Sequence, residues 1–482
     1  MINLLFNNKQ IIKLTSDSNL KKIIFYSLPG FVSIFISALS ILLFLNYFST
    51  TSYANYIIQH LFITIGQGVL NLNLGRIAAI KIQNLDSTNK KKIISTAILT
   101  SFISGVILSI FVCLFFLFFL KKFNIIEITI TLLFGLIISC IYQTCEDIGK
   151  GMGYVKLCSA SNLLFFSISI SMPAILMINE PTKSIIIDYA FEISVFVKFL
   201  TLFFLIVVFL KKKIFSLEKF ELKKIQNFFY PSIWLTISAL FSQLFYNCDK
   251  YFIKISLGAS QLILYSLPQQ LSQKLGIISQ AISSVILPKL SKKTNNKKNI
   301  LTANIYGVFY FLSIILIITL PFLDYILSFI FQNKYNDIIT IMLKIFILIN
   351  FFNCISNIII DSYHSEMNTK KDVRYLFFAS VPFVIGLIVC SQFKQILFFV
   401  GLIFFKDFIL LIKRILSAKH LIKNYKLFIL QIIILNGLYM SEIYKKHWAY
   451  IAFVIIFLFL FIKNSNKDLI LNYFYNKNKK II

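Results

Sequence analysis

The segment IISTAILTSFISGVILSIFVCLFFLFFL, residues 93–120, runs for 28 residues without a charged side chain, and lysines lie directly on both sides of it. A helix needs about 20 predominantly apolar residues to cross the hydrocarbon core of a bilayer. Backbone polar groups find no water there, so a helix, which satisfies them internally, is the structure expected for such a segment. The segment therefore predicts a transmembrane helix.

Apolar segments of this kind recur along all 482 residues, and 58% of the chain is hydrophobic while 14% is charged. Soluble domains contain about 45–50% apolar residues. The sequence therefore predicts an all-α fold, that of a polytopic integral membrane protein. We predict fourteen spans, near residues 23–46, 54–80, 93–120, 125–148, 154–178, 184–210, 226–256, 260–288, 300–323, 338–360, 375–391, 395–412, 427–441 and 448–462.

The basic residues between these spans predict the orientation of the chain. If the N-terminus lies in the cytoplasm and the loops alternate, cytoplasmic segments contain 34 Lys and Arg residues and outer loops contain 9. Short cytoplasmic loops of membrane proteins carry the excess of Lys and Arg. We therefore expect both termini in the cytoplasm. The same bias explains the net charge of +29, so we reject nucleic acid as a partner and expect contacts with membrane lipids instead.

Four of the predicted spans carry a polar face, and the first span does so weakly, with Ser33, Ser37 and Ser40. Residues spaced by three, four or seven lie on one side of a helix, so each set can line a hydrated cavity or bond a neighbouring helix. The sets are His60, Thr64, Gln67 and Asn71 in the second span; Ser232, Thr236, Gln243, Asn247, Lys250 and Lys254 in the seventh; and Ser266, Gln269, Gln270, Gln273, Gln280 and Ser284, with Lys274 beside them, in the eighth.

The positions of these polar faces predict an internal repeat. They lie in the first two spans of each six-span block, as in transporters with a cavity between two parallel repeats. We predict an N-terminal lobe at residues 1–210, a C-terminal lobe at 211–412, and two extra spans with a cytoplasmic tail at 413–482.

A family resemblance rests on the seventh and eighth spans. The stretches NCDKYFIKISLG (residues 247–258), LYSLPQQLSQK (264–274) and AISSVILPKLS (281–291) resemble the oligosaccharide flippases of the multidrug/oligosaccharidyl-lipid/polysaccharide exporter superfamily. Members show an acid, a basic residue, an apolar run, Leu-Gly and then a tyrosine that opens the next helix. The stretch from residue 53 to residue 76 is also similar to the family's second span. This chain departs from the pattern at Lys250, where relatives often have arginine.

The resemblance implies a flippase rather than an enzyme. Its cargo would be an undecaprenyl-diphosphate-linked oligosaccharide, moved from the cytoplasmic to the outer leaflet of a bacterial inner membrane for O-antigen or capsule synthesis. Other membrane proteins of polysaccharide assembly would be further partners. We expect no cofactor and no catalytic residue. We also expect no metal site, because the seven cysteines are scattered through apolar segments without the spacing of metal ligands.

Five residues are the candidates for binding the diphosphate. Lys274 lies near the middle of its span, about 18–20 Å from either interface at 1.5 Å per residue, too far for its ammonium to reach water. The others are Lys250, Lys254, Arg76 and Gln273. A cationic, hydrated cavity would spare the diphosphate the cost of entering hydrocarbon unpaired.

Other charges inside the spans have different expected roles. We expect Lys198 to form an internal ion pair with Asp188 or Glu192, which are spaced by four. Glu146, Asp147, Lys406 and Asp407 are candidates for ion coupling. Because adjacent residues point in different directions on a helix, we expect Lys406 and Asp407 each to have a partner elsewhere.

Two alternatives to the flippase remain open. A drug or metabolite exporter of the same superfamily would favour acidic rather than basic residues at mid-membrane. A membrane polymerase or glycosyltransferase usually needs a sizeable outer loop for its catalytic groups, and no predicted outer loop exceeds about 15 residues.

Overall fold

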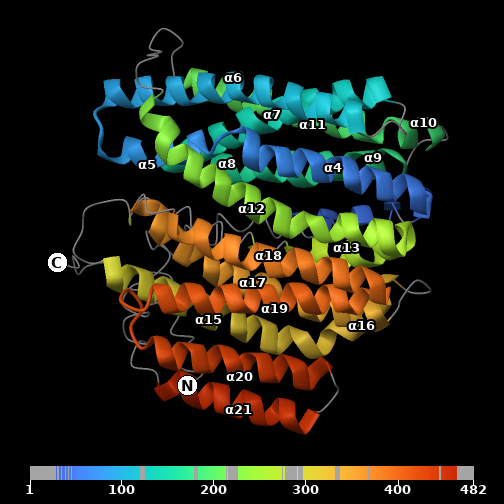
Figure 1. The fold of residues 1–482 in the computed structure, drawn as a ribbon, viewed down its shortest axis with the longest axis vertical. Coiled ribbons are helices and arrows are strands. Elements are labelled where there is room, and N and C mark those ends of the chain that lie inside the picture. Colours follow the sequence, from blue (N-terminus) through green and yellow to red (C-terminus); the bar gives the residue numbers. More distant parts are fainter. Residues whose placement is uncertain are drawn as a thin grey trace, which may run out of the picture. The chain divides into compact units, whose positions relative to one another are not determined.

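Helices account for all the regular structure that the computed structural model describes, and no strand occurs in that part of the chain (Figure 1). This confirms the predicted all-α, polytopic membrane fold. The described residues are 29, 32–33, 35–37, 39–41, 43–44, 46–119, 125–178, 183–212, 214, 226–273, 275–276, 290, 297–331, 337–366, 370–443 and 447–463.

Eight helices within the described residues are long and apolar enough to cross a membrane. Fourteen spans remain the prediction for the chain. Two spans predicted as short, 375–391 and 427–441, are longer in the structure, where α18 covers Lys370–Phe393 and α20 covers Tyr425–Ile443. Both helices therefore have the length that a bilayer crossing requires.

The chain forms two compact units. The N-terminal unit comprises Pro29–Leu267 and Ser365–Phe399, and the C-terminal unit includes Pro268–His364 and Val400–Ile482. These units group helices that contact one another, whereas the lobes predicted at 1–210 and 211–412 follow the sequence repeat. The predicted division remains a prediction.

The N-terminal unit is built on closely packed helices near its start. A Cβ on Gly75 would lie 2.7 Å from the Thr144 Cα, so only glycine lets α5 approach α7 this closely. The helices are α4 (Thr50–Leu70), α5 (Leu74–Lys81), α6 (Ser87–Phe119), α7 (Ile125–Gly151), α8 (Val155–Asn162), α9 (Ser169–Leu176), α10 (Lys183–Asp188), α11 (Ala190–Lys211), α12 (Gln226–Leu257), the first part of α13 (Ala259–Gln273), and α18.

The span predicted at 54–80 is interrupted. Helix α4 ends at Leu70, α5 begins at Leu74, and both Leu72 and Asn73 have positive φ angles, of 51° and 50°. The side-chain oxygen of Asn71 accepts the backbone N–H of Asn73 at 2.8 Å and stabilises the turn. Expecting one continuous helix here was therefore wrong, because asparagine can replace helical hydrogen bonds with local ones.

Two further helices depart from regular α geometry. A π-helical turn at Leu163–Ile168 joins α8 to α9, and such turns often occur at functional sites. The span predicted at 184–210 breaks at Tyr189, between α10 and α11.

Helix α12 packs against α4 on one side and α18 on another. Ser232 donates a hydrogen bond to the Leu72 carbonyl, at the turn between α4 and α5. On the α18 side, Ser238 donates to the Asp372 carboxylate at 2.8 Å. The contacts with α4 place part of the predicted seventh-span polar face in a helix interface.

The C-terminal unit contains the last part of α13 and, further along the chain, α15 (Lys297–Thr319), α16 (Leu323–Phe331), α17 (Asp337–Ser365), α19 (Ile396–Ser417), α20 and α21 (His447–Lys463). Phe309 on α15 contacts Phe351, Phe428 and Phe457 from three other helices. Gln431 on α20 donates to the Tyr310 hydroxyl on α15 at 2.7 Å. The last two predicted spans are thus packed into this unit.

Candidate functional site

The motif that carries the family resemblance forms a helical hairpin. Gly258, with φ +90°, separates α12 from α13. Asp249 is buried, and its carboxylate accepts the Tyr265 hydroxyl from α13 and the Lys250 backbone N–H at 2.9 Å. The acid and the tyrosine of the motif therefore fasten α12 to α13.

Lys250 and Lys254 lie one turn apart on α12, as their spacing predicts. Lys250 is 7% exposed. Lys254 is less buried, and its ammonium donates to the Asn55 side-chain oxygen on α4 at 3.2 Å. A neutral amide holds the Lys254 ammonium without cancelling its charge.

Two residues of the polar face predicted for the second span, Gln67 and His60, contact other helices of the N-terminal unit. Gln67 donates to the Gln143 side chain on α7 at 2.8 Å, and Gln143 in turn donates to Asp147 at 3.1 Å. The ring of His60 packs against Phe191 of α11, with 5.5 Å between ring centroids. These side chains therefore bond and pack between helices of one unit.

Arg76 belongs to the same network as Gln67. It lies on α5, just after the break in the second span, and interacts electrostatically with Asp147. Next to Asp147, Glu146 forms an ion pair with Lys150 at 2.6 Å and accepts the Asn162 side chain at 2.7 Å. Glu146 is thus paired with a base, and Asp147 lies near the bases Lys150 and Arg76.

The remaining candidates of the eighth span are partly described. Lys274, Gln280 and Ser284 lie outside the described residues. Gln273 is half-buried at the end of α13. One residue earlier, Ser272 accepts the Asn350 side chain of α17 at 3.0 Å. The binding role predicted for Lys274, Lys250, Lys254, Arg76 and Gln273 remains a prediction.

Two expectations about ion pairs were wrong. Lys406 and Asp407 contact each other at 3.4 Å, because a lysine side chain is long enough to curve toward the next residue. Lys198 has no acid within ion-pair distance among the described residues. Its ammonium lies 5.4 Å from the centroid of the Phe165 ring, and the helix break at Tyr189 places Asp188 on α10 instead of α11.

Sequence reasoning missed the ion pairs of Lys344. This lysine on α17 contacts Asp324 of α16 at 3.2 Å and Glu442 of α20 at 3.6 Å. The partners lie 20 and 98 positions away, so no local spacing indicates them. Buried lysines rarely lack a partner, and that general rule was the only available signal.

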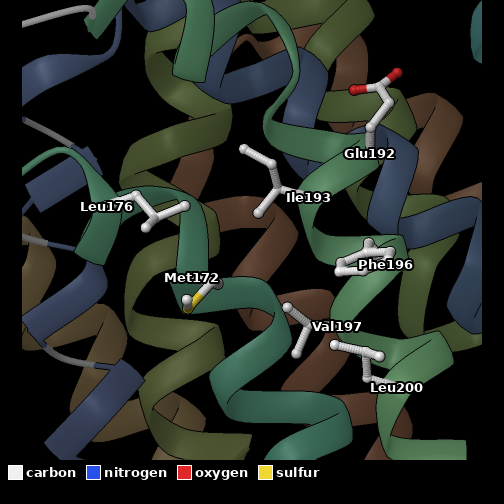
Figure 2. Close-up of a pocket in the computed structure, with 7 residues that line it drawn as sticks. All are labelled: Met172, Leu176, Glu192, Ile193, Phe196, Val197 and Leu200. Carbon is white, nitrogen blue, oxygen red and sulfur yellow. The ribbon is translucent and has the colours of Figure 1, made fainter. Parts of the chain in front are cut away.

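An apolar groove lies between α9 and α11 (Figure 2). Its volume is about 510 Å³, and Glu192 at one end points its carboxylate away from the apolar side chains in Figure 2. The other lining residues are Met172, Leu176, Ile193, Phe196, Val197 and Leu200. This lining suits a hydrocarbon chain better than a charged headgroup.

Among the described residues, no group of three or more His, Cys, Asp or Glu side chains could hold a metal ion.

Comparison with solved structures identifies the fold. A MATE transporter structure in complex with MaL6 matches with a TM-score of 0.64, 13% identity, and coverage of 86% of this chain and 99% of that one. A MOP-superfamily transporter from Pyrococcus furiosus matches with a TM-score of 0.64 and 13% identity over 86% of this chain and 98% of that one. At this identity the likeness concerns the fold alone.

Sequence comparison gives a shorter match. A candidate O-antigen transporter from Shigella flexneri is 26% identical over 138 residues, which is 28% of this chain and 33% of that protein. The match thus spans about a third of the length of this relative, and no family model matches the chain. The proteins matched are transporters, not enzymes. The resemblance to the MOP exporter superfamily that the sequence predicts is confirmed, and the chain is a polytopic membrane protein with the fold of its MATE transporters.

Proposed function

We propose that this transporter moves polyprenyl-diphosphate-linked oligosaccharide from the cytoplasmic to the outer leaflet of a bacterial inner membrane, with both its termini in the cytoplasm. The similarity to a candidate O-antigen transporter supports this cargo class. The observation that carries the proposal is the pair of lysines on α12, Lys250 and Lys254, beside a single buried acid, Asp249.

The charges of α12 suit a diphosphate. A diphosphate carries roughly two negative charges, and an ammonium attracts a phosphate oxygen 4 Å away by about 4 kcal/mol at an effective dielectric near 20. Lys254 can exchange the Asn55 amide oxygen for a phosphate oxygen without leaving an acid unpaired. A lysine holds phosphate as a point charge, whereas an arginine at this position could form two parallel hydrogen bonds to it.

A drug exporter of the same fold would recognise cations through acids. The described acids of the α7 network do not suit that role, because Glu146 pairs with Lys150 and Asp147 interacts with Lys150 and Arg76. The lysines of α12 favour an anionic cargo instead.

The test is flipping of the proposed cargo in proteoliposomes. Purified protein should expose undecaprenyl-diphosphate-linked oligosaccharide to an externally added glycosidase, and protein-free vesicles should not. Lys250→Gln with Lys254→Gln should slow flipping at least about tenfold, which corresponds to 1.4 kcal/mol. The matched control is Lys413→Gln, at an exposed lysine of α19. Flipping of a cationic dye but not of the lipid-linked sugar would assign the drug-exporter function instead.

A further inference from the structure

The apolar groove between α9 and α11 has the size of a ligand site (Figure 2). Met172 and Leu176 line it from α9, and Ile193, Val197 and Leu200 line it from α11. The spacing of the three α11 residues places them on one face of that helix. The volume of about 510 Å³ lies within the range of about 300–1,000 Å³ that small-molecule sites occupy.

The groove opens toward the surface of the N-terminal unit. Phe196 and Leu200 are 60% and 48% exposed, and exposed apolar side chains of a membrane protein face lipid. Both walls come from irregular helices. Pro173 lies inside α9, where proline removes a helical hydrogen bond and kinks the helix, and the chain breaks at Tyr189 just before α11 begins. These irregularities explain why α9 and α11 pack together and still leave a groove.

One end of the groove is acidic. Glu192 lies there and points its carboxylate away from the apolar side chains (Figure 2). Four positions earlier, Asp188 is exposed at the end of α10. The next basic residue along α11, Lys198, is 2% exposed, with its ammonium 5.4 Å from the centroid of the Phe165 ring. This end of the groove therefore favours a positively charged group.

An apolar groove with an acidic end matches an aminolipid. We propose that the groove binds a phospholipid whose headgroup carries a primary ammonium group. One acyl chain lies along α11 for the about 12 Å that separate Glu192 from Leu200 at 1.5 Å per residue, and the ammonium donates to the Glu192 carboxylate. A carboxylate has two oxygens with about four acceptor sites, so Glu192 can accept the ammonium in addition to its contacts within the protein.

The local charge separates this lipid from two other occupants. The net charge of +29 draws anionic lipids to the protein surface in general, but Glu192 and Asp188 repel them at this groove. The same two acids repel the diphosphate of the proposed cargo, so its polyprenyl tail is a poor match for the groove. A preference for an ammonium headgroup over an anionic one is therefore the property that identifies the site.

The first experiment measures that preference. The protein is purified in detergent and mixed with equal amounts of phosphatidylethanolamine and phosphatidylglycerol with identical acyl chains, and retained lipids are counted by native mass spectrometry. The unmodified protein should retain phosphatidylethanolamine at least about fivefold more, the upper end for an exposed ion pair. Glu192→Gln should retain both lipids equally. The matched control is Asp337→Asn, at an exposed acid that begins α17, and it should keep the preference. A preference for phosphatidylglycerol, or one that survives in Glu192→Gln, overturns the proposal.

The second experiment tests the groove itself. Val197→Phe fills the groove, whereas Val208→Phe makes the same change about three turns along the same face of α11. Added phosphatidylethanolamine should raise the unfolding temperature of the unmodified protein and of Val208→Phe, because a ligand that binds the folded state stabilises it. Val197→Phe should gain less, and its unfolding without lipid shows that it folds. An equal gain in Val197→Phe contradicts the proposal. Displacement of phosphatidylethanolamine by an equimolar polyprenyl phosphate would assign the groove to the cargo tail instead. Neither experiment uses flipping, so failure of the proposed function leaves this site untouched.

Discussion

Two buried lysines, one in each compact unit, have opposite surroundings. Lys344 in the C-terminal unit is 3% exposed and lies 3.2 Å from Asp324 and 3.6 Å from Glu442. Lys198 in the N-terminal unit is 2% exposed and, within the part of the chain that the structure describes, contacts the Phe165 ring and no acid. Burial alone therefore does not show whether an acid balances the charge of a lysine inside the membrane.

The paired lysine should show the largest effect on stability. Lys344→Met leaves Glu442 buried without its base, and breaking such a pair costs about 3–5 kcal/mol. Thermal unfolding in detergent and abundance in the membrane should both fall. Lys344→Met with Glu442→Gln should recover part of the loss. Equal stability of the single and double variants would show that the pair does not hold α20 in place.

The second-largest loss of stability is expected for Gly75→Ala, because α5 packs closely against α7 at this residue. An alanine Cβ at position 75 would lie 2.7 Å from the Thr144 backbone, so α5 must move away from α7. Overpacking of this kind costs about 1–3 kcal/mol. Gly401→Ala is the matched control, because nothing lies within 4 Å of its Cβ. A thermal midpoint that falls equally in both variants would contradict the packing argument.

These two sites show what the sequence can and cannot predict. Apolar length predicts where helices cross the membrane, since that signal is local. The glycine at position 75 and the acids around Lys344 act across helices, and their partners are distant in the sequence. The break at Asn71–Asn73 had a partial signal, because asparagine tolerates positive φ. Leu72 gave no signal, because leucine seldom adopts the positive φ that it has here.

The contacts of the predicted binding residues, like those of Gly75 and Lys344, could not be predicted from the sequence. The spacing of Lys250 and Lys254 correctly placed them one turn apart, but their neighbours could not be predicted. Asp249 accepts the Tyr265 hydroxyl, because Gly258 folds α13 back against α12. A hairpin geometry of this kind depends on one turn and leaves no periodic pattern.

A smaller effect is expected where α12 meets α18. Ser238→Ala removes the hydrogen bond to the buried Asp372 carboxylate. Hydrogen bonds to charged groups contribute about 1.5–3 kcal/mol, so a loss near the lower end is expected in thermal unfolding. Ser380→Ala is the control, since its hydroxyl bonds only within its own helix, at 2.6 Å from the Phe377 carbonyl. A loss in Ser380→Ala as large as in Ser238→Ala would mean that the α12–α18 hydrogen bond contributes nothing specific.

The smallest effect on stability should come from the lysine without an acid. Lys198→Met keeps a long, flexible side chain against Phe165 and removes an ammonium from an apolar interior, where an uncompensated charge is costly. No acid among the described residues loses a partner. We therefore expect thermal stability to stay within about 0.5 kcal/mol of the unmodified protein or to rise, a range that surface substitutions also show. Lys198→Met and Lys344→Met should be measured in the same detergent, because they make the same substitution at two lysines of similar burial. A loss at Lys198 as large as at Lys344 would mean that an acid balances it after all, and the contrast between the two units would disappear.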